Sequence, residues 1–222
     1  MLERVVDATA AAGAKLVMVD NLYAYGPGSM PITEATPHRA TDAKGRTRSA
    51  MVESLLGAHE AGRLPVAIGQ ASDYVGAGAD NSAVAATAVA PVAAGKATAR
   101  WMGDLDVPHA IAYSPDVARA YVALVTDDRA DGRAWVLPHA GAPTGREFIE
   151  ALATAAGRPI SAKAISPTML RLAAPFHKPS KETLGIIHQW VEPWTVDASD
   201  FEATFGFGAT TDLVEVAAAC LR

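Results

Sequence analysis

Residues 15–26 constrain the fold of this chain more than any other segment. They begin with an unbroken apolar run, residues 16–19, which is typical of a strand buried on both faces of a parallel sheet. In open α/β sheets, ligands bind just beyond the carboxyl ends of the strands. The pattern therefore predicts either the edge of a ligand site or an ordinary transition from a strand to a solvated loop. The hydrogen-bonding side chains that follow the run at once are Asp20, Asn21, Tyr23 and Tyr25.

A second segment repeats this layout. Residues 65–69 predict a strand, and a polar segment that ends in a glycine, residues 70–76, follows it. Between the two strands, residues 27–43 are rich in Pro, Thr, Gly and Asp and predict a long loop, a kind of segment that is more often functional than not. A helix then carries apolar residues on one face over residues 49–60. Since adjacent parallel strands share one carboxyl edge, we expect both polar segments to converge on one crevice.

The order of the predicted elements indicates an α/β fold. Residues 1–12 predict an amphipathic helix that leads directly into the first strand. A parallel strand needs neighbours joined to it by crossover connections, so we expect further chain upstream of this helix. Beyond residue 76 the sequence is alanine-rich and mostly helical, with a strand near residues 133–138 that we expect to return to the first sheet.

Two helix starts in the second half follow from local chemistry. The run Ser-Pro-Asp at residues 114–116 supplies an N-cap, a first-position proline and an acidic first turn. Thr144 and Glu147 have the spacing of a capping box, in which each side chain satisfies a free backbone amide of the other residue. We therefore expect helices to begin at both places.

Composition and charge exclude several function classes. The formal net charge is −5 and the basic residues are scattered, which argues against a nucleic-acid surface. No apolar run approaches the roughly 18 residues that a membrane span needs. The single cysteine, Cys220, excludes an internal disulfide and fits a reducing compartment. Because the sequence also begins without a signal-peptide pattern, we expect a cytoplasmic location.

Common catalytic motifs are missing from the sequence. The six histidines never reach the spacing of a metal site, so no metal is predicted. There is no Gly-x-Ser-x-Gly, and no Gly-x-Gly-x-x-Gly follows any predicted strand.

Several segments nevertheless resemble one enzyme family in the same order along the chain. Residues 20–26 are similar to the Ser-Ser-x-x-Val-Tyr-Gly segment of the extended short-chain dehydrogenases/reductases, the NAD-dependent epimerase/dehydratase family. Residues 73–76 resemble that family's Asn-Val-Tyr-Gly segment, which touches substrate, and residues 109–120 resemble its Phe-x-Tyr-Val-x-Asp-Val-Ala segment. Residues 144–157 resemble the helix after the returning strand, and residues 196–207 resemble the closing Asp-x-x-Lys-Phe…Gly-Phe motif.

The resemblance implies an NAD(P)-binding protein with a Rossmann-type sheet. It assigns residues 1–75 to the C-terminal portion of that sheet, joined by the strand near residues 133–138, and residues 76–222 to a smaller, mostly helical substrate-binding region. The opening helix resembles the one before the family's fifth strand. The resemblance therefore implies an N-terminally incomplete chain, without the Gly-rich turn that binds the cofactor pyrophosphate. The residue that distinguishes NAD from NADP would lie in that absent part.

The positions that carry catalysis in the family differ here. The family uses Tyr-x-x-x-Lys after the long loop, and this chain has Lys44 and Arg48 at that spacing, or Gly45 and Ser49 in the alternative register. Asn21 stands where the family has a Ser/Thr that polarises the substrate oxygen. The expected catalytic residues are Asn21, Tyr23, Lys44 and Arg48. The expected cofactor contacts are Arg48, Asp20 and Tyr25, and the expected substrate contacts are Asp73, Tyr74 and His109.

Three hypotheses about function remain open at this point. The first is an NAD(P)-dependent epimerase, dehydratase or reductase that acts on a small carbonyl or hydroxyl compound, including a nucleotide sugar. The second is a non-catalytic nucleotide-sensing or partner-binding protein on the same scaffold. The third is a fragment whose first strand offers an open edge to another chain. A homodimer through residues 1–12 and 49–60 is an additional expectation from the family.

Overall fold

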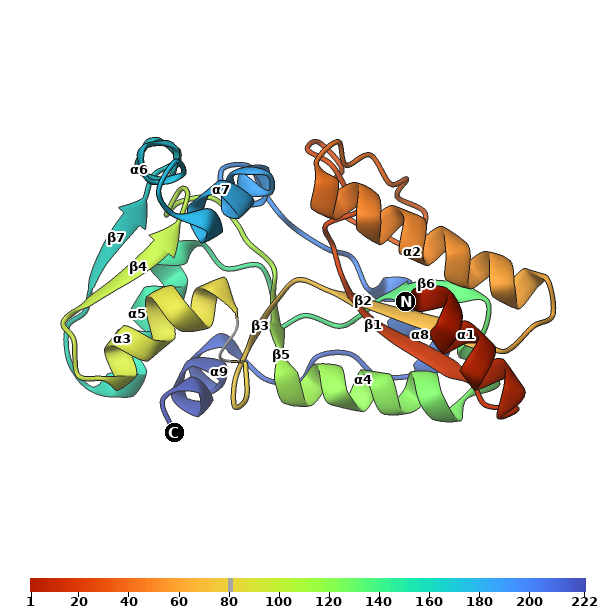
Figure 1. Cartoon of the computed structure of the whole chain (residues 1–222). Coiled ribbons are helices and arrows are strands. Elements are labelled where there is room, and N and C mark those ends of the chain that lie inside the picture. The colour runs from red at the N-terminus through yellow and green to blue at the C-terminus, as the bar shows by residue number, and fades with distance from the viewer. Residues whose placement is uncertain (80–81) are drawn as a thin grey trace. The chain divides into compact units, whose positions relative to one another are not determined.

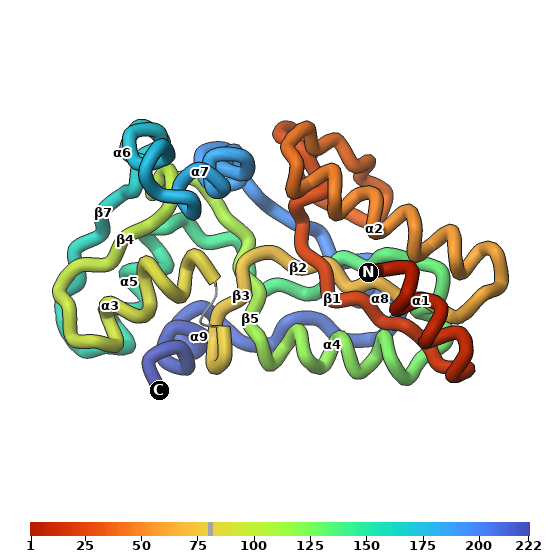
Figure 2. The backbone as a smooth tube through the Cα atoms, viewed as in Figure 1, coloured from red at the N-terminus to blue at the C-terminus, as the bar shows by residue number. Residues whose placement is uncertain are grey.

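The computed structural model describes residues 1–79 and 82–222 (Figure 1). The chain forms two compact units and passes between them repeatedly. The first unit comprises Met1–Ala71, Val117–Pro138 and Asp197–Gly208, and the second comprises Ser72–Asp116, His139–Val196 and Ala209–Arg222. Figure 2 lets the reader follow these passages, for example from β2 (Val66–Ala71) into β3 (Asp73–Val75) and from β5 (Ile111–Tyr113) into α4 (Ser114–Thr126).

The first unit is built on a three-stranded parallel sheet in the order β1-β2-β6. Its strands are β1 (Leu16–Asn21), β2 (Val66–Ala71) and β6 (Arg133–Val136). The two predicted strands are therefore neighbours, and Asp20 is in register with Gln70 near their carboxyl ends. The predicted α/β class is confirmed, and the strand expected near residues 133–138 pairs with β2.

Helices lie on both sides of this sheet. Figure 1 shows the strands between α2 (Ala43–Glu60) and α4. An apolar cluster joins α1 and α2 to the sheet through buried side chains that include Val6, Met18, Leu55 and Ile68. The helices of this unit are α1 (Leu2–Ala11), α2 (Ala43–Glu60), α4 (Ser114–Thr126, from Val117 on) and α8 (Ser199–Phe205), with a 3₁₀ turn at Asp128–Ala130.

The expectation that the first strand is buried on both faces is wrong at Val19. Its side chain is 61% exposed, although Met18 and Asp20 on either side of it are buried. The helix α4 packs on the neighbouring strand, where the Tyr121 hydroxyl donates to the carbonyl of Gly69. Val19 is in register with Gly69, so this face of the sheet is covered at β2 and open at β1.

The second unit contains two small parallel sheets that sequence analysis did not predict. β3 (Asp73–Val75) pairs with β5 (Ile111–Tyr113), and β4 (Thr98–Met102) pairs with β7 (Ser161–Ile165). A core that includes Trp101, Phe148, Leu152 and Trp190 holds the unit together. Its helices are a π-helix Ala85–Val89, α3 (Ala90–Ala93), α5 (Gly145–Ala156), α6 (Pro167–Ala173), α7 (Lys178–Leu184), a 3₁₀ turn Ile187–Trp190 and α9 (Leu213–Cys220).

Both predicted helix starts are confirmed. The Thr144 hydroxyl accepts from the Glu147 amide at 3.2 Å, and the Glu147 carboxylate accepts from the Thr144 amide at 2.8 Å, which completes the capping box. α4 begins at Ser114, whose hydroxyl donates to the carbonyl of Val75 at the end of β3. None of the helices in the described ranges is both long enough and apolar enough to cross a membrane.

Candidate functional site

A buried polar chain occupies the carboxyl ends of β1 and β2. The Tyr25 hydroxyl donates to Gln70 Oε1 at 2.7 Å, and Gln70 Nε2 donates to Asp20 Oδ2 at 3.1 Å. All three side chains are at most 3% exposed. These partners fix the orientation of the Gln70 amide, because the Asp20 carboxylate can accept a hydrogen bond only from the amide nitrogen. Two of the expected cofactor contacts, Asp20 and Tyr25, thus form a closed network beneath the surface.

Asp20 faces a cation on its other oxygen. The Arg48 guanidinium lies 3.3 Å from Asp20 Oδ1, and this oxygen accepts no hydrogen bond among the described residues. Burial raises the pKa of Asp20, while hydrogen bonds from the Asn21 amide and Gln70 and the charge of Arg48 oppose that rise. About a third of the Arg48 side chain, 34%, is exposed. Arg48 is therefore held by a buried carboxylate and can still present part of its guanidinium to a ligand.

Tyr25 is poorly placed to transfer a proton. Its hydroxyl proton is donated to Gln70, and burial raises the pKa of its phenol well above the usual range, with the charges of Glu34 and Asp20 adding to that effect. A phenol with a raised pKa is a weaker acid and stays protonated near neutral pH. Tyr25 therefore acts as a structural hydrogen-bond donor in this arrangement.

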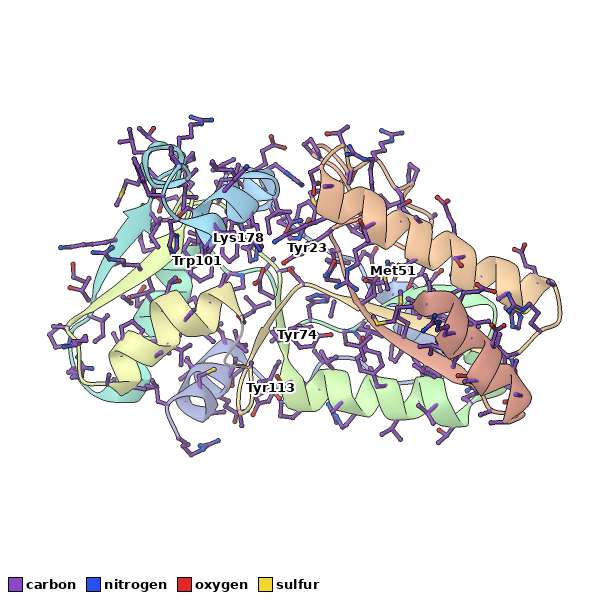
Figure 3. All side chains as sticks on the ribbon, viewed as in Figure 1. Tyr23, Met51, Tyr74, Trp101, Tyr113 and Lys178 are labelled. Carbon is purple, nitrogen blue, oxygen red and sulfur yellow. The ribbon has the colours of Figure 1, made fainter. Side chains whose placement is uncertain are left out.

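Asn21 and Tyr23 lie at the point where β1 opens into the loop. Asn21 Oδ1 accepts from the Tyr23 backbone amide at 3.0 Å, which closes an Asx turn. Both side chains are half-buried, and Figure 3 labels Tyr23. Because the Asn21 oxygen is used locally, its amide nitrogen is the end that can donate to a ligand. Lys44 stands in the exposed first turn of α2, two residues after the helix cap Asp42.

In the alternative register the family's tyrosine would stand at position 45, where packing leaves no space for a side chain. Gly45 is buried, and a Cβ at this position would collide with Ala40 Cβ and the carbonyl oxygen of Tyr23. No larger side chain fits there without displacement of the loop. The second position of that register, Ser49, turns toward a histidine that sequence analysis did not select.

That histidine is His38, in the long loop before α2. His38 Nδ1 lies 3.0 Å from Ser49 Oγ, and Ser49 Oγ donates to Glu53 Oε1 at 3.1 Å. The His38 ring also meets the Tyr25 ring edge-on, with 5.1 Å between centroids. The loop contains no motif around His38, and only its position in a long loop just before a helix could have drawn attention to it.

In the second unit, His109 is buried among polar and aromatic groups. Its Nε2 lies 3.0 Å from Asp73 Oδ2 and its Nδ1 lies 2.9 Å from the carbonyl oxygen of Gln189. The ring stacks on Trp190 at 3.8 Å and meets Trp101, labelled in Figure 3, edge-on. Only 1% of the His109 side chain is exposed, against 16% for Asp73. Of the expected substrate contacts, Asp73 and Tyr74 are partly exposed to solvent. His109 is buried and contacts Asp73 through Nε2.

The cofactor and metal capacity of these residues is limited. Among the described residues, no group of three or more His, Cys, Asp and Glu side chains could hold a metal ion. Asn21 at the end of β1, together with Arg48 and Lys44 from α2, could contact a ribose or an amide. They are scattered donors, and they do not form the continuous backbone cradle that a pyrophosphate uses.

Solved structures of other proteins share the fold of this chain. No family model and no curated protein matches the sequence. Among solved structures, the UDP-glucuronic acid 4-epimerase of Bacillus cereus, solved with NAD, matches 99% of this chain with a TM-score of 0.77 and 15% identity. The chain has the fold of the NAD-dependent epimerases and dehydratases.

Two further structures extend this match to other members of the fold. The dTDP-glucose 4,6-dehydratase of Bacillus anthracis, in complex with NAD, has a TM-score of 0.76 and 14% identity over 99% of this chain. The protein RMD of Pseudomonas aeruginosa, complexed with NADPH, has a TM-score of 0.75 and 18% identity over 99% of this chain. The chain spans 64% of the epimerase, 64% of the dehydratase and 69% of RMD.

Proposed function

We propose that this chain is an NAD(P)-dependent epimerase, dehydratase or reductase that acts on a small carbonyl or hydroxyl compound. The observation that carries the proposal is the match of 99% of the chain to structures solved with NAD or NADPH. A sugar attached to a nucleotide is one candidate substrate, because such substrates appear in the names of two of the matched enzymes.

The residues present fit one end of such a cofactor. Arg48 and Asn21 offer donors at the carboxyl end of β1, where open α/β sheets bind their ligands. The sequence contains no Gly-x-Gly-x-x-Gly turn for the pyrophosphate. A bound nicotinamide cofactor would supply hydride transfer. We therefore assign these residues to the ribose or nicotinamide end and none to the phosphates.

Asn21 would orient the substrate oxygen. Its Oδ1 already accepts from the Tyr23 amide, so its amide nitrogen is free to donate to a carbonyl or hydroxyl oxygen. Such a bond strengthens as negative charge develops on that oxygen, which is the condition for a contribution to rate. Arg48 would add positive charge near the same strand end without exchanging a proton, because its guanidinium stays protonated.

A specific observation favours the alternative, a non-catalytic nucleotide-sensing or partner-binding protein. The family's tyrosine has no counterpart here, since Gly45 has no space for a side chain and Arg48 is paired with Asp20. Neither position provides a phenol next to a lysine. This alternative therefore retains cofactor binding and loses turnover.

Titration with NADH and NADPH, followed by nicotinamide fluorescence, separates the two functions when it is combined with turnover assays on sugars, ketones and nitro-carbonyl compounds. Binding with turnover that falls in the Asn21→Ala variant supports the proposal. The matched control is Thr47→Ala, which removes an exposed side chain on α2 and should leave turnover unchanged. Binding without turnover supports the alternative. Absence of binding contradicts both.

A further inference from the structure

A small pocket in the first unit contains an ordered chain of three polar side chains. The pocket has a volume of about 220 Å³. Glu53, Ser49 and His38 are linked in series along its wall, with bonds of 3.1 and 3.0 Å. The residues that line the pocket are His38, Ala40, Arg46, Ser49, Ala50 and Glu53.

The direction of the hydrogen bonds fixes the form of the imidazole. A serine hydroxyl has one proton, and Ser49 donates it to the Glu53 carboxylate. Ser49 Oγ can therefore only accept from His38, so the His38 proton sits on Nδ1. In a neutral imidazole with Nδ1–H, the lone pair is on Nε2. No hydrogen bond to His38 Nε2 occurs among the described residues, so this lone pair is available to a ligand.

The surroundings keep this imidazole neutral near neutral pH. Burial lowers the pKa of His38, and the charges of Asp20 and Glu53 oppose that change without cancelling it. The groups that face the ring are Asp20 from β1, Tyr25 from the loop after β1, and Glu53 with Arg46 from α2. The Arg46 guanidinium donates to the carbonyl of Thr41, which ties it to the loop.

We propose that His38 Nε2 is the proton-accepting group of the first unit and that its ligand is a small hydroxyl compound. In this step the O–H bond of the ligand breaks, an N–H bond forms at Nε2, and the ligand oxygen keeps the electron pair. The resulting imidazolium retains its Nδ1–H bond to Ser49, so Ser49 and Glu53 act as positioning residues. The inference rests on the proposed function, for which it supplies the acid/base group that the missing tyrosine would have provided.

Other candidates for this role are less suited to it. The Tyr25 proton is donated to Gln70, and its phenol is buried. Arg48 remains charged and cannot accept a proton. His38 combines an open lone pair, a fixed tautomer and a pocket that admits a ligand.

The first test uses nitrogen-15 NMR of the histidine-labelled protein and needs no substrate. His177 is the internal control, because its Nδ1 accepts from the Ser180 amide and its proton must therefore sit on Nε2. We expect His38 to be a neutral Nδ1–H tautomer at neutral pH and His177 to be the opposite tautomer when neutral. Ser49→Ala should remove the tautomer preference of His38 alone. An Nε2–H form of His38, or an imidazolium at neutral pH, would overturn the proposal.

The second test measures turnover once a substrate is found by the assays above. His38→Gln should lower kcat by about 10²- to 10⁴-fold with little change in KM, and Ser49→Ala should shift the acidic limb of the pH profile. His177→Gln should change neither. Full activity of folded His38→Gln would refute the role of His38 and leave the proposed function standing. If cofactor binding fails, the proposed function fails, and the NMR tautomer of His38 decides the proton-acceptor inference alone.

Discussion

His38 in the first unit and His109 in the second are both held by hydrogen bonds and ring contacts, yet they differ in what they can do. The His38 ring lines a pocket and donates through one nitrogen to a serine, while its other nitrogen has no hydrogen-bond partner among the described residues. The His109 ring has a partner on both nitrogens and an indole stacked on its face. The partners of a histidine, rather than its place in a motif, decide whether it can exchange a proton.

The hydrogen-bond acceptors around His109 explain its structural character. The carbonyl of Gln189 can only accept, so His109 Nδ1 must donate to it. The other ring nitrogen, Nε2, lies 3.0 Å from Asp73 Oδ2, so both nitrogens have a partner. The ring therefore joins the backbone of the 3₁₀ turn to β3, and neither of its nitrogens is open to a ligand.

The largest loss of stability should come from replacing His109. His109→Gln removes the hydrogen bond to the buried carbonyl of Gln189 and the stack on Trp190. An unpaired buried acceptor costs about 1–3 kcal/mol and the loss of an aromatic stack about 0.5–1.5 kcal/mol, so we expect the free energy of unfolding from urea titration to fall by about 2–4 kcal/mol. Asp73→Asn and the double variant complete a cycle, and strictly additive losses would show that the two side chains do not interact.

A smaller effect tests the packing beside the first unit's site. Gly45→Ala places a Cβ against Ala40 and the Tyr23 carbonyl and should destabilise the protein by about 1–3 kcal/mol. The matched control lies in the same helix, because a Cβ on Gly57 meets nothing within 4 Å. Gly57→Ala should stabilise the protein by about 0.5–1 kcal/mol through helix propensity. Equal changes in both variants would mean that Gly45 is not confined as described.

The buried carboxyl of the first unit should make stability depend on pH. Burial raises the pKa of Asp20, so the folded chain binds a proton there more tightly than the unfolded chain does. Stability therefore falls as the pH rises from the unfolded toward the folded pKa. Asp20→Asn removes this fall, and its stability relative to the parent protein should improve from mild acid to neutral pH in urea titrations. The pKa of Glu34 is also raised by burial, but Glu34 titrates in both proteins and cancels from the difference. A difference that stays constant with pH would contradict the burial of an ionised Asp20.

The smallest change in stability should follow from His38→Gln. The side chain is half-buried and open to its pocket, so its loss should alter the free energy of unfolding by no more than about 0.5 kcal/mol. His109→Gln is chemically the same substitution, so the difference between the two losses in the free energy of unfolding reflects the surroundings of each ring. A loss at His38 as large as that at His109 would assign both residues to structure.

Local patterns in the sequence were enough to predict the elements that depend on near neighbours. The capping box of Thr144 and Glu147 involves residues within one helical turn, and it forms as expected. The pairing of β1 with β2 follows from two apolar runs joined by a single helix. These features need no knowledge of distant contacts.

Features that depend on distant partners could not be predicted in the same way. The exposure of Val19 is set by where α4 packs, and the burial of His109 is set by Trp190, far along the chain. The pairing of His38 with Ser49 joins a loop without regular structure to a helix. The strand β7 has mostly small and exposed side chains, so it lacks the apolar alternation that marks a strand.

The reactivity of the two histidines can be compared directly in one folded sample. Diethyl pyrocarbonate acylates neutral imidazoles, and digestion with mass spectrometry gives a rate for each histidine peptide. We predict rapid modification of His38 at neutral pH, and protection of His109 until the protein unfolds. An unreactive His38, or a His109 that reacts equally fast in the folded protein, would show that the two rings do not differ in access as described.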